Sequence, residues 1–172
     1  MAQQVFVKCE KCNREDAFLF GKIAETNVYE HFLDVYEKKQ INLFDKNKFI
    51  EVFSKEYADQ APKEDLEKAL TKMYDEINEF FSEEEKKLIQ KNILIGHDLW
   101  MHSVIKIDEI GNPDAKVYNI PVLKLKFLGQ KEEYTRHYNN NVGYIQFDDD
   151  HQYLTCPTCG IKSSKYIKEE TV

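Results

Sequence analysis

Glycine and proline are scarce in this chain of 172 residues, which contains 6 glycines and 4 prolines. No Gly/Ser-rich or Pro-rich stretch divides the sequence, so we expect one domain over residues 1–172. Long apolar runs are also absent, and this excludes a membrane-spanning helix, which needs about 20 apolar residues. The first residues lack the charged and apolar regions of a secretory signal. These absences together predict a cytoplasmic protein with no membrane partner.

Apolar residues, in contrast, are plentiful. Hydrophobic side chains make up 42% of the chain and aromatic ones 13%, which is enough to build a core and excludes a disordered chain. The net charge is −7, so the chain as a whole has no electrostatic attraction to nucleic acid or to anionic membranes.

Cysteine occurs only four times, in two pairs of identical spacing: Cys9, Cys12, Cys156 and Cys159. Cytoplasmic thiols stay reduced, so paired CxxC motifs indicate metal ligands rather than disulfides. Two thiolates on one tight turn chelate a single ion, and two such turns complete the tetrahedron of a structural zinc site. The residues after each motif, Asn13 and Gly160, are of the types that tolerate the positive φ of such turns. We therefore predict one structural Zn²⁺.

Two other interpretations of the cysteines stay open. A mononuclear iron site of the rubredoxin type uses the same four thiolates, and a redox-active CxxC is the less favoured alternative. In either metal case Cys12 and Cys156 are separated by most of the chain, and the entropy cost of closing a loop rises only logarithmically with its length. Metal binding is therefore expected to be coupled to the stability of the whole domain.

The two motifs resemble those of the zinc-ribbon and rubredoxin-like knuckle class. A looser resemblance is to β-tent domains, such as the Yippee and cereblon thalidomide-binding types. This resemblance implies an antiparallel sheet clamped by an N-terminal and a C-terminal CxxC. It covers the knuckles and, loosely, residues 93–155, and it carries over no ligand-binding residue beyond the four cysteines.

A block of helices is expected over residues 26–92, with Thr26 and Asp45 near the starts of the first two. The third begins after Pro62 and carries one apolar stripe: Leu66, Leu70, Met73, Ile77 and Phe81. Ser82 and Glu85 fit a capping box, which predicts a short fourth helix to about Asn92, although a continuous helix through Ser82 is the alternative.

Over residues 93–155 the apolar side chains repeat every two residues, as in a β-strand. Leu123, Leu125 and Phe127 alternate with lysines, and residues 134–138 predict another strand. The expected fold is therefore α+β. It consists of a zinc-stapled antiparallel β-sheet, formed by residues 1–25 and 93–172, with an inserted block of three to four amphipathic helices over residues 26–92.

Histidines and aspartates suggest weaker candidate sites. The run from Asp148 to His151, with His137 on the preceding strand, offers ligands for a second metal and hence a metal-dependent hydrolase, but such runs are more often solvated turns. His97 and His102 flank Asp98 and suggest a general base, but their spacing in a strand directs them to opposite faces. We therefore assign no catalytic residue.

Two charged surfaces suggest partners. Basic residues flank the knuckles and predict, as the alternative, a nucleic-acid-binding module: Lys8, Lys11, Arg14, Lys162, Lys165 and Lys168. Carboxylates outnumber lysines over residues 63–91 and suggest an acidic surface for a basic protein. The leading hypothesis is a non-enzymatic, zinc-stabilised interaction, regulatory or inhibitor protein with a protein partner.

Overall fold

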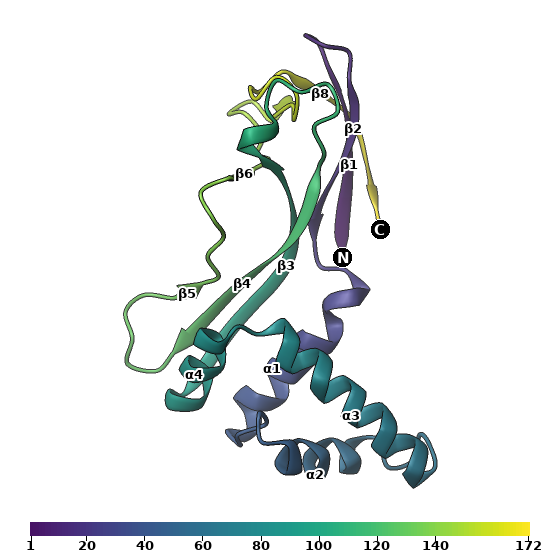
Figure 1. The fold of residues 1–172 in the computed structure, drawn as a ribbon, viewed down its shortest axis with the longest axis vertical. Coiled ribbons are helices and arrows are strands. Elements are labelled where there is room, and N and C mark those ends of the chain that lie inside the picture. The colour runs from purple at the N-terminus through teal and green to yellow at the C-terminus, as the bar shows by residue number, and fades with distance from the viewer. The chain divides into compact units, whose positions relative to one another are not determined.

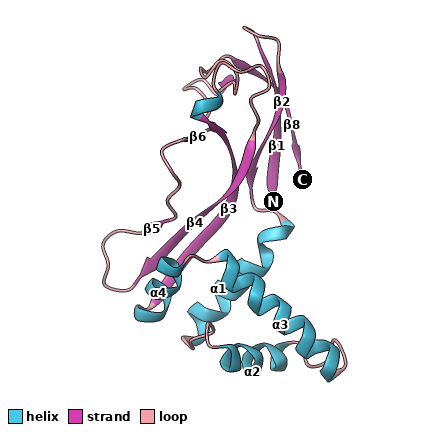
Figure 2. Cartoon of the chain, in the orientation of Figure 1, coloured by secondary structure: helices cyan, strands magenta, loops and turns pink.

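The computed structural model describes all residues, 1–172, and shows four α-helices and a curled antiparallel sheet (Figures 1 and 2). The α+β class expected from the change of period is confirmed. The chain forms two compact units. We call them the sheet unit (Met1–Ala24, Leu99–Leu123 and Thr135–Val172) and the helical unit (Glu25–Asp98 and Lys124–Tyr134).

The sheet has eight strands in the order β5-β4-β3-β2-β1-β8-β7, with β6 also paired to β3. Their bounds are β1 Ala2–Cys9, β2 Glu15–Gly21, β3 Leu94–Lys106, β4 Tyr118–Phe127, β5 Tyr134–Thr135, β6 Val142–Tyr144, β7 Tyr153–Leu154 and β8 Ser164–Thr171. A 3-10 turn, Ile107–Glu109, follows β3.

Strand β1 lies between β2 and β8 and is antiparallel to both (Figure 1). Its register with β2 runs from Ala2 opposite Gly21 to Lys8 opposite Glu15. On its other side Cys9 lies opposite Ser164, just beyond the second CxxC. This register brings the first cysteine pair beside the second.

The core of the sheet unit is a cluster of buried apolar side chains: Val5, Val7, Phe18, Ile105, Ile145 and Leu154. Val5, Val7 and Cys9 alternate along β1 and are all buried, as expected for one face of a strand with a period of two. The first cysteine is therefore the last member of a core stripe.

The helical unit contains α1 (Asn27–Lys39), α2 (Lys46–Glu56), α3 (Lys63–Phe80) and α4 (Glu83–Lys91). Asp45 caps α2 by accepting hydrogen bonds from the backbone N–H groups of Asn47 and Lys48. Ser82 and Glu85 form the predicted capping box, so a separate fourth helix is confirmed and a continuous helix is wrong. Thr26 occupies the N-cap position of α1, but its side chain makes no capping hydrogen bond.

Aromatic side chains fill the core of the helical unit. The ring of Phe32 lies 5.1 Å from that of Phe44 and 5.7 Å from that of Phe81, measured between centroids. From the predicted stripe of α3, Leu70 and Ile77 are fully buried. Burial of these large aromatic rings stabilises the unit.

The strand expected over residues 134–138 is shorter than predicted, because β5 contains only Tyr134–Thr135. Beyond it, the N–H of Arg136 still donates to the carbonyl of Leu123, and the Tyr138 hydroxyl donates to the carbonyl of Pro121. Pro121 has no N–H to offer a partner strand, so a regular ladder cannot continue past it.

Candidate metal centre

Each cysteine pair lies on a tight turn closed by backbone hydrogen bonds. In the first, the N–H of Asn13 donates to the Cys9 carbonyl (3.0 Å), and Asn13 has a φ of 63°. In the second, the N–H of Gly160 donates to the Cys156 carbonyl (2.8 Å), and Gly160 has a φ of 71°. The positive φ predicted at both positions is confirmed. Two equivalent turns from opposite ends of the sequence thus present their thiols to one point.

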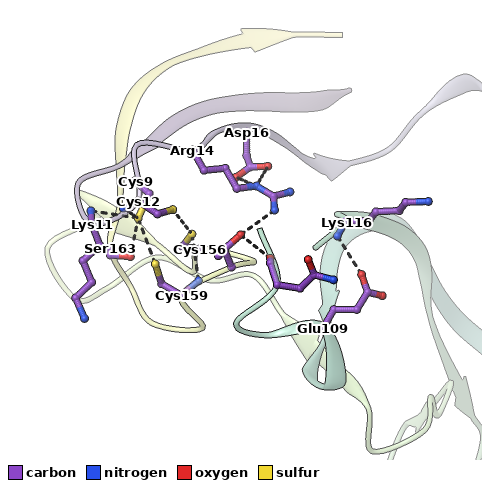
Figure 3. A network of polar contacts seen from close by, with 12 residues as sticks. Cys9, Lys11, Cys12, Arg14, Asp16, Glu109, Lys116, Cys156, Cys159 and Ser163 are labelled. Atoms are coloured by element: carbon purple, nitrogen blue, oxygen red, sulfur yellow. Dashed lines mark hydrogen bonds and ion pairs between the residues drawn. The ribbon is translucent and has the colours of Figure 1, made fainter. Parts of the chain in front are cut away.

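The four sulfurs form a compact group (Figure 3), with all Sγ atoms within 4.8 Å of one another. The Sγ atoms of Cys9 and Cys159 are 3.8 Å apart, and those of Cys12 and Cys156 are 3.7 Å apart. A Zn–S bond of about 2.3 Å implies sulfurs about 3.8 Å apart in a regular tetrahedron. The four cysteines are therefore positioned to hold a metal ion.

Hydrogen bonds converge on the sulfur of Cys9. Backbone N–H groups of Lys11 and Cys12 point at it at 3.4 and 3.5 Å, and the Ser163 hydroxyl lies 3.1 Å away. The N–H of Cys159 makes the corresponding contact to Cys156 at 3.5 Å. Such donors stabilise thiolates and orient them toward a metal. Ser163 was not identified from the sequence, because only the pairing of β1 with β8 brings it to Cys9.

The thiols differ in acidity. Burial opposes ionisation of Cys9, but the hydrogen bonds from Ser163 and from the backbone of Cys12 and Lys11 outweigh it, and the pKa of Cys9 is about 6. Burial and the neighbouring sulfurs raise the pKa of Cys159 to about 12, and burial also raises the pKa of Cys156. Four adjacent thiolates repel one another, so ionisation of the whole set calls for a cation at its centre.

Polar contacts link the two knuckles directly (Figure 3). The Arg14 guanidinium donates from Nε to both carboxylate oxygens of Asp16 (3.0 Å) and from Nη1 to the Thr158 hydroxyl (3.0 Å). Thr158 in turn donates to the carbonyl of Asn112 (3.1 Å), and its own carbonyl accepts from the N–H of Gly111 (2.6 Å). The second knuckle is therefore fastened both to β2 and to the turn that follows β3.

The aspartate run forms a turn. The Asp148 carboxylate accepts hydrogen bonds from the backbone N–H groups of Gln152 (3.0 Å) and Tyr153 (3.2 Å), and His151 has a φ of 55°. These bonds lower the pKa of Asp148, the bond from Gln152 having the largest effect. Oδ1 of Asp148 therefore holds this turn together, and the hypothesis of a second metal at the run stays a prediction.

The two histidines of β3 have unrelated partners. His97 has both ring nitrogens at 2.9 Å from carboxylates of α1, those of Asp34 and Glu37. His102 lies in the sheet unit, where its Nε2 donates to the carbonyl of Ile145 (2.9 Å). The two rings are thus held by separate sets of contacts.

Most of the basic residues around the knuckles have partners within the chain. Lys168 lies 2.8 Å from the Glu170 carboxylate and over the ring of Phe6, and Lys165 lies 3.9 Å from Glu10. Lys162 donates to a backbone carbonyl, that of Phe147. With Arg14 paired to Asp16, four of the six basic residues on which the nucleic-acid-binding alternative depends are engaged internally.

Comparison of the chain with protein-family models, with curated proteins and with solved structures gives no match. No helix has both the length and the apolar character needed to cross a membrane. Conclusions about function therefore depend on the site and the surfaces described above.

Proposed function

We propose that the four cysteines bind one structural Zn²⁺ and that the chain is a non-enzymatic interaction protein. The observation that carries this proposal is the group of four thiols within 4.8 Å of one another, in which the pairs Cys9–Cys159 and Cys12–Cys156 are 3.8 and 3.7 Å apart, the spacing of a Zn–S tetrahedron. A catalytic zinc keeps one position open for water or substrate, whereas four protein thiolates occupy every position. Zinc bound here supplies cross-linking rather than chemistry.

The protein partner is proposed to be basic and to bind the outer surface of α3 and the first turn of α4. Only Leu70 and Ile77 of α3 are fully buried, so most of this helix faces solvent. Its exposed residues and those at the start of α4 include eight carboxylates: Glu64, Asp65, Glu67, Asp75, Glu76, Glu79, Glu83 and Glu84. Such a surface attracts a cationic partner and disfavours nucleic acid.

Metal content is the first test. Protein expressed without a His tag and purified without added metal is expected to contain one zinc ion per chain, measured by inductively coupled plasma mass spectrometry. Removal by a chelator is expected to unfold the sheet unit, seen as loss of β signal in circular dichroism. If the protein instead contained iron, recognised by its visible absorption, the four cysteines would be assigned to an iron site. Retention of the full fold without metal would remove the structural role.

The binding surface is tested with a fluorescent oligolysine peptide as the basic probe. The double variant Glu67→Lys/Glu76→Lys is expected to weaken binding, because it reverses two charges on α3. A matched variant, Glu25→Lys/Glu169→Lys, changes the net charge equally at exposed positions elsewhere and is expected to have little effect. Equal weakening by both variants would show that only net charge matters and would contradict the proposed surface.

A further inference from the structure

We propose a second binding surface in the helical unit: the groove between α1 and α2, which fits an acidic, amphipathic helix of a partner protein. The groove has a volume of about 670 Å³ and is lined entirely by residues of α1, of α2 and of the segment between them. Three half-buried aliphatic side chains contribute apolar surface to it: Val35, Ile41 and Val52.

The groove is lined by three lysines without ion-pair partners. Lys38 and Lys39 lie in the last turn of α1, and Lys48 lies in the first turn of α2. Residues 40–45 join these turns, so the three lysines come from the adjoining ends of the two helices. In a chain of net charge −7, three unpaired cations beside exposed apolar surface favour an anionic ligand.

The carboxylates of the groove, in contrast, have partners within the chain. Glu56 lies 2.7 Å from Nε2 of His31, and Asp34 lies 2.9 Å from Nε2 of His97. Glu51 lies 3.8 Å from Nζ of Lys55, one turn further along α2. Asp34 and Glu56 are thus engaged by histidine rings and Glu51 by Lys55, whereas Lys38, Lys39 and Lys48 form no ion pair.

A helix matches these features better than nucleic acid does. The groove extends from His31 to Lys39 along α1, a rise of about 12 Å, which accommodates about two turns of a bound helix. Helices dock in such grooves through apolar residues spaced three and four apart. Single-stranded nucleic acid binds through aromatic rings on which bases stack, and the one ring that lines this groove, that of His31, is engaged by Glu56.

The test uses the intact zinc-loaded protein and a labelled synthetic peptide of 16 residues, with leucines at helical spacing and glutamates on both flanks. Saturable binding is expected in fluorescence anisotropy. The variant Lys38→Glu/Lys48→Glu is expected to weaken it about tenfold, because two attractions become repulsions. Val52→Gln is expected to weaken it without altering the charge. The matched variant Lys72→Glu/Lys87→Glu, with the same net charge on α3 and α4, is expected to bind as the wild type does.

Several outcomes would overturn the proposal. These are the absence of saturable binding, equal weakening by both charge-reversed variants, and equal binding of a peptide with lysines in place of the glutamates. If oligothymidylate displaced the labelled peptide at a lower concentration than the unlabelled peptide does, the groove would be assigned to nucleic acid. A concentration-dependent dimer that Lys38→Glu/Lys48→Glu abolishes would assign it to a second copy. Circular dichroism checks the fold, and Lys38→Gln/Lys48→Gln serves as the milder variant.

Discussion

Gly160 packs directly against Ile110, so that a Cβ atom on Gly160 would lie 2.7 Å from Cγ2 of that side chain. Ile110 follows the 3-10 turn after β3, whereas Gly160 follows Cys159, one of the four clustered cysteines. The contact therefore joins the second knuckle to a distant part of the sheet unit. Together with the hydrogen bond from Gly111 to Thr158, it makes the knuckle a packed element rather than a free loop.

Replacement of Gly160 by alanine should destabilise the protein strongly, for two reasons. The positive φ costs about 1–2 kcal/mol for a residue with a Cβ, and the clash with Ile110 adds about 1–3 kcal/mol. Gly129→Ala is the matched control, since Gly129 has a φ of 81° and nothing lies within 4 Å of its Cβ position. Urea unfolding of the zinc-loaded protein measures both costs. Equal costs would show that the contact with Ile110 contributes nothing.

Ser163→Ala should weaken zinc binding by about tenfold or more, because the hydroxyl lies 3.1 Å from the Cys9 sulfur, within reach to donate to a thiolate, and loss of such a partner typically costs about 10–100-fold in metal affinity. Competition with a chromophoric chelator measures this affinity. The neighbouring Ser164 provides the control, since its buried hydroxyl oxygen has no hydrogen-bond partner. Ser164→Ala should leave zinc affinity unchanged. An effect of similar size in both variants would point to altered packing instead.

Local signals in the sequence predicted much of this fold. The spacing of the cysteines predicted the cluster, and the capping residues Asp45 and Ser82 predicted helix starts, because ligand spacing and caps depend only on neighbouring residues. The role of Ser163 and the contact between Ile110 and Gly160 could not be predicted. Both depend on strand register and on packing between segments that are far apart in the sequence.

The same limit explains where strand prediction failed. Alternation of side chains over residues 134–138 resembled a strand, yet the ladder ends after Thr135 because Pro121 lies on the facing strand. The α1–α2 groove was equally hidden, since its apolar and basic residues come from two helices whose packing the sequence does not specify. A surface formed by two or more helices or strands is therefore difficult to predict from patterns in a single sequence.

Tyr134→Phe should destabilise the helical unit by about 1.5–3 kcal/mol, the usual contribution of a hydrogen bond to a charged group. The buried carboxylate of Glu85 accepts hydrogen bonds from the Tyr134 hydroxyl (2.9 Å) and from the N–H of Ser82 (2.9 Å). Burial and the Glu85 carboxylate raise the pKa of Tyr134, so its hydroxyl stays a donor at neutral pH. Tyr118→Phe removes a bond to the more exposed Glu109 and should cost less. Thermal unfolding ranks the two, and the opposite order would contradict this role for Glu85.

Acidification should reduce stability through His102. Burial lowers the pKa of this ring below its ordinary value of 6.5, while the bond to the Ile145 carbonyl opposes that shift. The neutral ring is therefore favoured in the folded state. Its contribution is fully present above pH 6.5, where the unfolded chain is also neutral, and is lost as pH falls through 6.5 toward the folded-state pKa.

An NMR titration of the His102 ring protons should give a midpoint below 6.5. His102→Gln keeps a donor for Ile145 but cannot titrate, so its unfolding free energy should fall less than that of the wild type between pH 7.5 and 5.5. If the four cysteines hold the proposed metal, its loss at low pH should affect both proteins alike, and the comparison therefore isolates the histidine. A midpoint at or above 6.5 would mean that the folded state favours the charged ring. Acid would then stabilise the sheet unit through His102, and the edge contacts that its ring makes with Phe20 and Tyr144 would accommodate an imidazolium.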